Sequence, residues 1–302
     1  QLLGGEVMFS RLYYFQHTFN VHAYLNAVDE TTALQKAHGS PSDLSMTVGN
    51  AIVALVCAGQ FERVRSLHAE VMPVSNAYGD VGTAAQLELF DSIVDTATGH
   101  FSRARKRQAK VVAMFREAGM PWLSVVIATA ASPAILTGDW ETAETEIMEA
   151  VEKAVDCPTF TGFETCQLLY LRALMGDPRA HELLDRYEAI LPVRGQLNSV
   201  GSCHMLLFWV ESAVLLGQPE RAAQHYDSVV DLIRRDTVTC YFPMLIERIA
   251  GIAAMAGEQY DKAQAHFAAS LELAKELAFV SELGDTRRWH AMMLLRRRAP
   301  GD

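Results

Sequence analysis

Glycine recurs along this chain at intervals of 38 to 41 residues, in phase with apolar stretches of helical periodicity. A short cassette follows each glycine, such as Gly59-Gln60-Phe61 or Gly138-Asp139-Trp140. A fixed period of this size is typical of stacked helical hairpins, because no single hairpin can bury its apolar face alone. The sequence therefore predicts an all-α protein whose successive hairpins share one core. The recurring glycines are Gly59, Gly99, Gly138, Gly176, Gly217 and Gly257.

The unit around Gly138 illustrates the predicted hairpin. We expect a first helix over about Trp122 to Leu136, followed by a turn at Gly138, where the backbone freedom of glycine suits a helix end. Asp139 is a suitable cap for the second helix, and the apolar residues after it recur at helical spacing. The predicted apolar stripe comprises Trp140, Ala143, Ile147, Ala150, Val151 and Ala154.

The same period divides the whole chain into units. Thr18 occupies the place of the glycine in a degenerate first unit, and Gly301 falls where the next glycine is due. The last unit lacks its second half, which predicts a fragment of a longer multidomain protein. We therefore expect one continuous repeat domain over residues 1–302 instead of the two domains that length alone suggests. The predicted units lie near 3–37, 42–78, 82–118, 121–156, 160–192, 197–235 and 238–278, with a partial unit at 281–302.

Charge argues against a general nucleic-acid-binding surface, since the formal net charge is −10. The densest basic run lies on a predicted second helix, where most of it should face solvent on the convex side. No aromatic residues are interleaved with it, as a nucleic-acid-binding surface would favour. This run comprises Arg103, Arg105, Lys106, Arg107 and Lys110.

Cysteine usage and hydropathy favour a cytoplasmic protein without a metal site or cofactor. The five cysteines form no CxxC pair and no zinc-like spacing, and their odd number favours reduced, buried thiols. No secretory signal is visible. The uncharged stretch from Ala118 to Gly138 is long enough to span a bilayer. However, Pro121, Pro133 and the place of the stretch in the repeat favour a buried helix over a membrane span.

The cassette of glycine, any residue, an aromatic and then spaced small residues resembles the second-helix signature of tetratricopeptide repeats (TPR). Pro178 and Pro219 depart from it by replacing aromatics, and the period is about 40 instead of the usual 34. Longer periods of this kind are similar to the TPR-type regions of bacterial MalT- and LuxR-type regulators and of adenylate-cyclase-linked signalling ATPases. The closest match is Gly138, Trp140, Ala143, Ile147 and Ala150.

The resemblance implies a right-handed superhelical solenoid of about seven TPR-like hairpins. In that family the residues 13, 10 and 6 positions before each glycine point into the concave wall. The wall would be largely apolar, which suits a protein or peptide partner, or a small effector. The expected binding residues are Gln86, Phe163, Cys166, Tyr170, His204, Leu207, Glu211, Met244 and Glu247.

The resemblance further implies a regulatory binding module of a bacterial signal-transduction ATPase or transcription regulator. Any ATPase or cyclase activity would lie outside these residues, since they contain no GxxxxGK[ST] motif. Two alternatives stay open: an enzyme built on helical repeats, and an oligomerisation scaffold that forms a homo-oligomer. For the enzyme, His204 and Glu211 would lie about 10 Å apart on one helix and would not pair directly. A closed pocket with convergent titratable groups would favour the enzyme, and an open groove would favour recognition.

Overall fold

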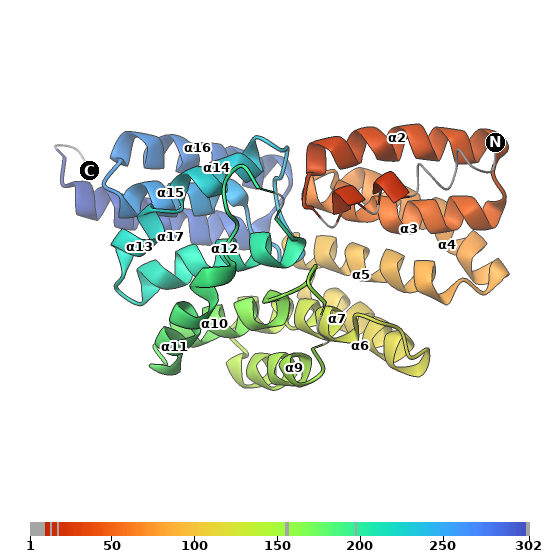
Figure 1. Cartoon of the computed structure of the whole chain (residues 1–302), viewed down its shortest axis with the longest axis horizontal. Helices are drawn as coiled ribbons and strands as arrows, with labels where there is room; N and C mark the ends of the chain where they lie inside the picture. The colour runs from red at the N-terminus through yellow and green to blue at the C-terminus, as the bar shows by residue number, and fades with distance from the viewer. Residues whose placement is uncertain (1–9, 13, 17, 155–156, 197, 300–302) are drawn as a thin grey trace.

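The computed structural model describes residues 10–12, 14–16, 18–154, 157–196 and 198–299, and within these ranges every regular element is a helix (Figure 1). The prediction of an all-α protein is therefore confirmed for the described part of the chain. The first helices along the chain are α2 (Val21–His38), α3 (Pro41–Cys57), α4 (Phe61–Tyr78), α5 (Val81–Ala97), α6 (Phe101–Glu117), α7 (Leu123–Ala130), α8 (Ser132–Thr137) and α9 (Trp140–Glu152). They are followed by α10 (Phe163–Met175), α11 (Arg179–Tyr187), the 3-10 helix η1 (Glu188–Ile190), α12 (Val200–Leu215), α13 (Pro219–Ala223), α14 (Tyr226–Ile233), α15 (Ile246–Ala256), α16 (Tyr260–Glu276) and α17 (Val280–Arg297).

The recurring glycines lie at the turns between paired helices, as predicted. The first five have a left-handed backbone, with φ between 68° and 80°, which a residue with a side chain adopts only at a cost. Gly257 is the exception, since its φ is −90° and Glu258 takes the left-handed conformation instead. Before α2, where the repeat has no glycine, Phe19 takes this conformation. The turn geometry therefore recurs even where the glycine does not.

The predicted continuous helix from Trp122 to Leu136 is wrong, because the structure divides it into α7 and α8. Pro133 lies in the first turn of α8 and has no backbone N–H for a continuing helix. Trp122 itself precedes α7 with a left-handed backbone (φ 66°). The uncharged stretch is thus broken into short pieces. None of the helices among the described residues has the combination of length and apolarity that crossing a bilayer requires.

A second difference lies between α14 and α15, where the unit predicted from residue 238 lacks its first turns of helix. Residues 237–245 run as a non-helical segment, which we call the inner segment. Pro243 disfavours helical backbone at the residue before it, and Thr237, Val238 and Thr239 are β-branched. The inner segment is buried except at Val238, which is partly buried. It therefore fills the interior of the molecule instead of extending a hairpin.

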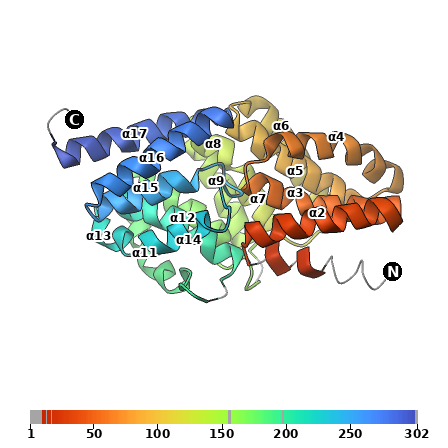
Figure 2. The same ribbon diagram turned by 90° about the horizontal axis from the view of Figure 1, so that it is seen from above.

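Most first helices of the hairpins pack on the first helix of the next hairpin, and the last of them returns to α5. α3 packs on α5, α7 on α10, α10 on α12, α12 on α15 and α15 on α17, and α17 also contacts α5. Figure 1 accordingly shows the N-terminal helices beside the C-terminal ones, with α6, α7 and α9 to α11 below both. Figure 2 shows the same two groups side by side from another direction. The chain thus folds back on itself.

The two groups meet at the turns. A side chain at Gly59 would come within 3.0 Å of Leu277, and one at Gly99 within 3.4 Å of Val280. The rings of Phe61 and Phe279 lie 6.0 Å apart across the same junction. Gly59 is therefore needed both for its backbone conformation and for close approach, whereas Gly99 is needed for its backbone conformation. The beginning of the predicted first unit (residues 3–9) and residues 300–302 of the partial unit lie outside the described residues.

Candidate functional site at helices α4 to α6

The middle of the predicted concave wall faces the inner segment. The rings of Phe163 and His204 lie 4.8 Å apart, and both contact Tyr241 of the inner segment. His204 Nδ1 lies 2.8 Å from the Val200 carbonyl oxygen, and Nε2 lies 3.2 Å from the Tyr241 backbone nitrogen. Nδ1 therefore carries the proton and donates, while Nε2 accepts from the Tyr241 N–H. The structure brings these wall residues together and covers them with the chain itself.

The other predicted wall residues are divided between the interior and the edges. The Tyr170 ring lies 6.2 Å from that of Phe242 in the inner segment. Glu247 is half-buried and pairs with His266 of α16 (2.6 Å), and Gln86 is half-buried on α5. Met244 was expected on a helix but lies in the inner segment. The buried members of this group are Cys166, Tyr170, Leu207, Glu211 and Met244.

Glu211 belongs to an interior polar cluster that joins α12, α15 and α17. Arg248 is 1% exposed, and its Nη1 donates to Glu211 (2.7 Å) while its Nε donates to Glu282 (2.9 Å). Trp289 Nε1 donates to the second oxygen of Glu211 (2.8 Å). Burial lowers the pKa of Arg248, but the two carboxylates outweigh that effect and hold the pKa well above its usual value. We call Glu211, Arg248, Glu282 and Trp289 the interior cluster.

A second polar group lies on α5, on a face turned away from the inner segment. Glu88, Asp91 and Asp95 are spaced i, i+3, i+7, so one face of the helix carries all three carboxylates. All three residues are buried, although they lie in a helix that is otherwise largely apolar. Buried carboxylates require charged or hydrogen-bonding partners. Those partners come from the next helix, α6.

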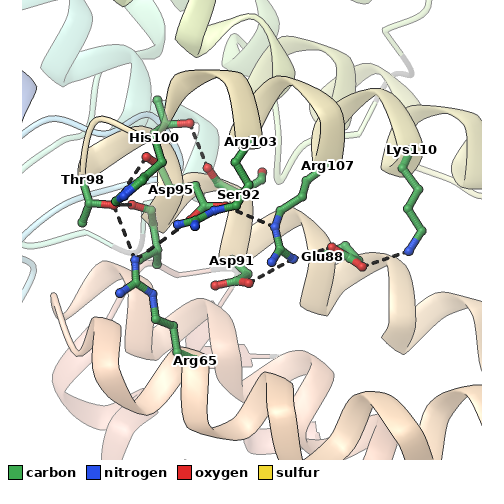
Figure 3. A network of polar contacts seen from close by, with 12 residues as sticks. Arg65, Glu88, Asp91, Ser92, Asp95, Thr98, His100, Arg103, Arg107 and Lys110 are labelled. Atoms are coloured by element: carbon green, nitrogen blue, oxygen red, sulfur yellow. Dashed lines mark hydrogen bonds and ion pairs between the residues drawn. The ribbon is translucent and has the colours of Figure 1, made fainter.

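Arg107 of α6 bridges the whole acidic row (Figure 3). Its Nη1 lies 2.6 Å from Glu88 Oε2 and 3.0 Å from Asp91 Oδ2, and its Nε lies 3.1 Å from Asp95 Oδ2. A guanidinium presents its N–H donors in a rigid fork, which suits it to hold several carboxylates at once. Arg107 therefore fixes the position of α6 on α5.

Further cations pair with the carboxylates at the two ends of the acidic row. Arg103 Nε and Nη2 lie 2.8 Å and 2.5 Å from the two oxygens of Asp95, a bidentate pair. Lys110 Nζ lies 2.9 Å from Glu88 Oε1 at the other end. Arg65 of α4 reaches the same place, with its Nη2 4.0 Å from Asp95 Oδ1. Three consecutive helices thus contribute to one charged network.

This network borders a cavity of about 310 Å³, which we call the α4–α6 site. The arginine side chains around it are 25% to 49% exposed, whereas the carboxylates beneath them are 2% to 7% exposed. Cations therefore line the open part of the cavity, and the acids lie at its base. The lining residues are Arg65, Asp91, Asp95, Arg103 and Arg107.

Burial and ion pairing together shift the pKa values of the carboxylates in different directions. Burial raises the pKa of Asp91, and the opposing effect of Arg107 does not cancel it. Burial also raises the pKa of Glu88, but Lys110 and Arg107 outweigh it, and the net shift is downward. Asp91 Oδ1 and His68 Nε2 are buried without a hydrogen-bond partner among the described residues. Asp91 is therefore the least satisfied group of the site.

The α4–α6 site was not predicted. Most of the basic run is exposed as expected, namely Arg103, Lys106 and Lys110. The ion pairs of the run were not foreseen, since Arg103, Arg107 and Lys110 pair with the acids of α5 and Arg105 pairs with Glu146 of α9 (2.8 Å). Two matching spacings in the sequence would reveal the site. Acids recur at i, i+3, i+7 on one predicted helix, and cations recur at i, i+4, i+7 on its hairpin partner.

The cysteines and the potential metal ligands of the described residues form no reactive or metal-binding site. All five cysteines are free, and only Cys157 is not buried. Burial raises the pKa of Cys203 and Cys240 to about 12, so both thiols are protonated and unreactive at neutral pH. Within the described part of the chain, no group of three or more histidine, cysteine or acidic side chains is arranged to hold a metal ion.

Comparison with known proteins identifies no family for this chain. No protein-family model matches the chain, and no curated protein matches it either.

Proposed function

We propose that this chain is a regulatory binding module, and that it binds an anionic small molecule at the α4–α6 site. The observation that carries the proposal is the convergence of three guanidinium groups, from α4 and α6, on one cavity of about 310 Å³. As its architecture we propose a right-handed superhelical solenoid of about seven TPR-like hairpins. The resemblance supports its place in a cytoplasmic bacterial signal-transduction ATPase or transcription regulator, with any catalytic activity in other domains.

The charge of the site favours an anion. Three arginines and two aspartates line the cavity, which leaves it positive within a chain whose formal net charge is −10. Each guanidinium has five N–H donors, more than these carboxylates can occupy. Arginine pairs well with planar carboxylates and with phosphates through two parallel hydrogen bonds. A ligand that carries a phosphate or carboxylate group therefore fits the site better than a neutral one.

The packing of the inner segment favours a binding site on α4 to α6 over one on the predicted concave wall. The inner segment occupies the space that the wall residues border, and its Val238 and Thr239 N–H groups both donate to the Cys57 carbonyl (2.8 Å and 3.0 Å). Displacement of the inner segment would expose its buried apolar side chains and break these bonds. Recognition at the α4–α6 site needs no such rearrangement, because its arginines are already partly exposed.

Helix α5 connects the site to the junction between the two ends of the fold. Its acidic face holds the arginines, and Phe90 on the same helix contacts Tyr241 of the inner segment (5.4 Å). α5 also contacts α17, close to where Gly99 lies against Val280. A ligand that favours one position of α5 would shift the equilibrium of this junction, provided that it binds the two arrangements unequally. This is the regulatory part of the proposal.

Isothermal titration calorimetry with pyrophosphate and sulfate tests the binding part. We expect the native chain to bind at least one of them, and Arg65→Ala to weaken that binding about tenfold through loss of charge-assisted hydrogen bonds. Arg63→Ala is the matched control, since Arg63 lies on the same helix but pairs with Asp29 outside the cavity (2.7 Å). Equal weakening by both variants, or no binding of either anion, contradicts the proposal.

Small-angle X-ray scattering tests the regulatory part separately. We expect saturating pyrophosphate to change the scattering profile of the native chain, and to leave the profile of Arg65→Ala unchanged at the same concentration. An identical profile for free and saturated native chain would contradict a conformational role for the site. The calorimetric result would then describe a binding site without a switch.

A further inference from the structure

A second cleft opens on the opposite face of α6, between α6, α7 and α9. Its volume is about 290 Å³, which lies at the lower end of the range for small-molecule pockets. Figure 1 shows the three helices as neighbours along the lower edge of the molecule. The cleft has apolar walls, one amide side chain and a charged rim. The residues that matter for its chemistry are Arg105, Gln108, Val112, Ile127, Ala130 and Glu146.

Gln108 lies on the buried stripe of α6, together with Ala104, Val111 and Phe115. At the same offset of nine residues after the glycine, the other hairpins carry Ile147 and Tyr226 but also His68, Asp185 and His266. Ile147 is fully buried and packs in the hydrophobic core. The buried stripe of α6 instead carries an amide among apolar residues. Packing alone does not explain a polar side chain at this buried position.

The Gln108 amide is not satisfied by the fold. The residue is 1% exposed, and neither its amide nitrogen nor its amide oxygen has a hydrogen-bond partner among the described residues. Buried polar atoms in native proteins are nearly always hydrogen-bonded, since each unpaired one is costly. Access from the cleft requires a rotation of the Gln108 side chain toward the open space. After such a rotation, the Gln108 amide can form hydrogen bonds with a ligand in the cleft.

The charged rim is already neutralised. Arg105 Nη1 lies 2.8 Å from both oxygens of Glu146, and Arg116 Nη2 lies 2.7 Å from Glu149 Oε1. Both pairs connect α6 to α9 across the cleft. A ligand within it therefore finds apolar walls and balanced charge, in contrast to the positive α4–α6 site. Among the buried polar groups that line the cleft, the Gln108 amide is the one whose donor and acceptor are both without a partner in the described residues.

We propose that this cleft binds a small neutral molecule with an apolar body and an amide-type edge, whose carbonyl and N–H pair with Gln108. A glutamine amide forms two parallel hydrogen bonds with such an edge, because it presents a donor and an acceptor side by side. Val112, Ile127 and Ala130 contact the apolar body. The cleft is separate from the α4–α6 site, so the test of this inference does not depend on whether the α4–α6 site binds anions.

Benzamide is the probe, and acetophenone is its isostere without the N–H donor. Ligand-observed and methyl NMR on the native chain should show benzamide contacts to the methyl groups of Val112 and Ile127. Benzamide should bind about tenfold tighter than acetophenone, because the ketone leaves the Gln108 carbonyl oxygen unpaired. Benzoate should bind more weakly than benzamide, since a carboxylate has no donor for that oxygen.

Gln108→Leu tests the assigned residue, because leucine matches the apolar residues beside it on the buried stripe of α6. We expect this variant to lose the preference for benzamide over acetophenone and to unfold at an equal or higher temperature than the native chain. Lys106→Leu, an exposed position on the same helix, is the control and should keep the preference. A preference that survives Gln108→Leu overturns the proposal. So does the absence of methyl contacts from benzamide in the native chain, a measurement that does not depend on how any variant folds.

Discussion

The interior cluster and the α4–α6 site use the same chemistry in opposite ways. In both, one arginine bridges carboxylates of neighbouring helices, two helices in the interior cluster and one in the α4–α6 site, with distances between 2.6 Å and 3.1 Å. Arg248 of the interior cluster is 1% exposed and has no access to a ligand, whereas the arginines of the α4–α6 site border a cavity. The difference teaches that residue type and pairing do not identify a binding site. Solvent access does, because only an exposed cation can exchange one partner for another.

Loss of Arg248 should produce the largest effect. Arg248→Met keeps the approximate volume of the side chain but leaves Glu282 buried without its cation, and leaves Glu211 with only the more distant Arg288 (3.5 Å). We expect the free energy of unfolding to fall by about 3–5 kcal/mol in urea denaturation. The triple variant Arg248→Met, Glu211→Leu, Glu282→Leu removes the unpaired charges and should recover much of the loss. If Arg248→Met is as stable as the native chain, the interior cluster does not hold α12, α15 and α17 together.

The pH dependence of stability should depend on His204, next to the inner segment. Burial lowers the pKa of His204 to about 4, from the usual 6.5, and the hydrogen bond to Val200 opposes this only partly. The unfolded chain therefore binds a proton between pH 6.5 and 4 that the folded chain does not. Stability should fall by about 3 kcal/mol as the pH falls through this window.

His204→Gln should remove this contribution while it keeps a hydrogen-bond acceptor near the Tyr241 N–H. The measurement is urea denaturation of both proteins at several pH values, and the quantity compared is the slope of the free energy of unfolding against pH. If the variant has the same slope as the native chain, other groups cause the acid sensitivity.

The two aspartates of the α4–α6 site should respond unequally to neutralisation. Asp95→Asn breaks the bidentate pair with Arg103 and should lower the free energy of unfolding by about 2 kcal/mol, as for other hydrogen bonds to charged groups. Asp91→Asn should cost less than about 1 kcal/mol, because burial already disfavours the charge of Asp91 and one of its oxygens is unpaired. Thermal denaturation at low and high salt measures both. A larger loss for Asp91→Asn would reverse the assignment of Asp95 as the structural acid.

The periodic glycines predicted most of the local structure, because a helix end with a left-handed turn is a local requirement. They placed the turns after α3, α5, α8, α10 and α12 correctly. The stripe after Gly138 held only in its middle, since Ala143, Ile147 and Ala150 are buried on α9. The prediction was wrong for its ends, because Trp140 is 40% exposed and Ala154 is exposed as well. The interruption at Pro133 was readable in principle, because proline cannot continue a helix from its carboxyl side.

The inner segment and the charged networks could not be read in the same way. A repeat pattern states which residues face a neighbouring helix, but not which distant segment enters the interior. The partners of Glu211 lie 37 and 78 residues away in Arg248 and Trp289, and no periodicity links them. The basic run on α6 was visible, yet its acids on α5 were hidden within a mostly apolar helix.

The sequence by itself determined an array of helical hairpins with a period near forty residues, because helix periodicity and turn conformation depend on neighbours along the chain. Only the tertiary structure decided which of its charges are enclosed and which are open. That outcome depends on how the last helix returns to α5 and on the inner segment that fills the space between them. Solvent access is a property of the closed fold as a whole, so the same arginine–carboxylate pairing became a support in one place and a candidate binding site in another.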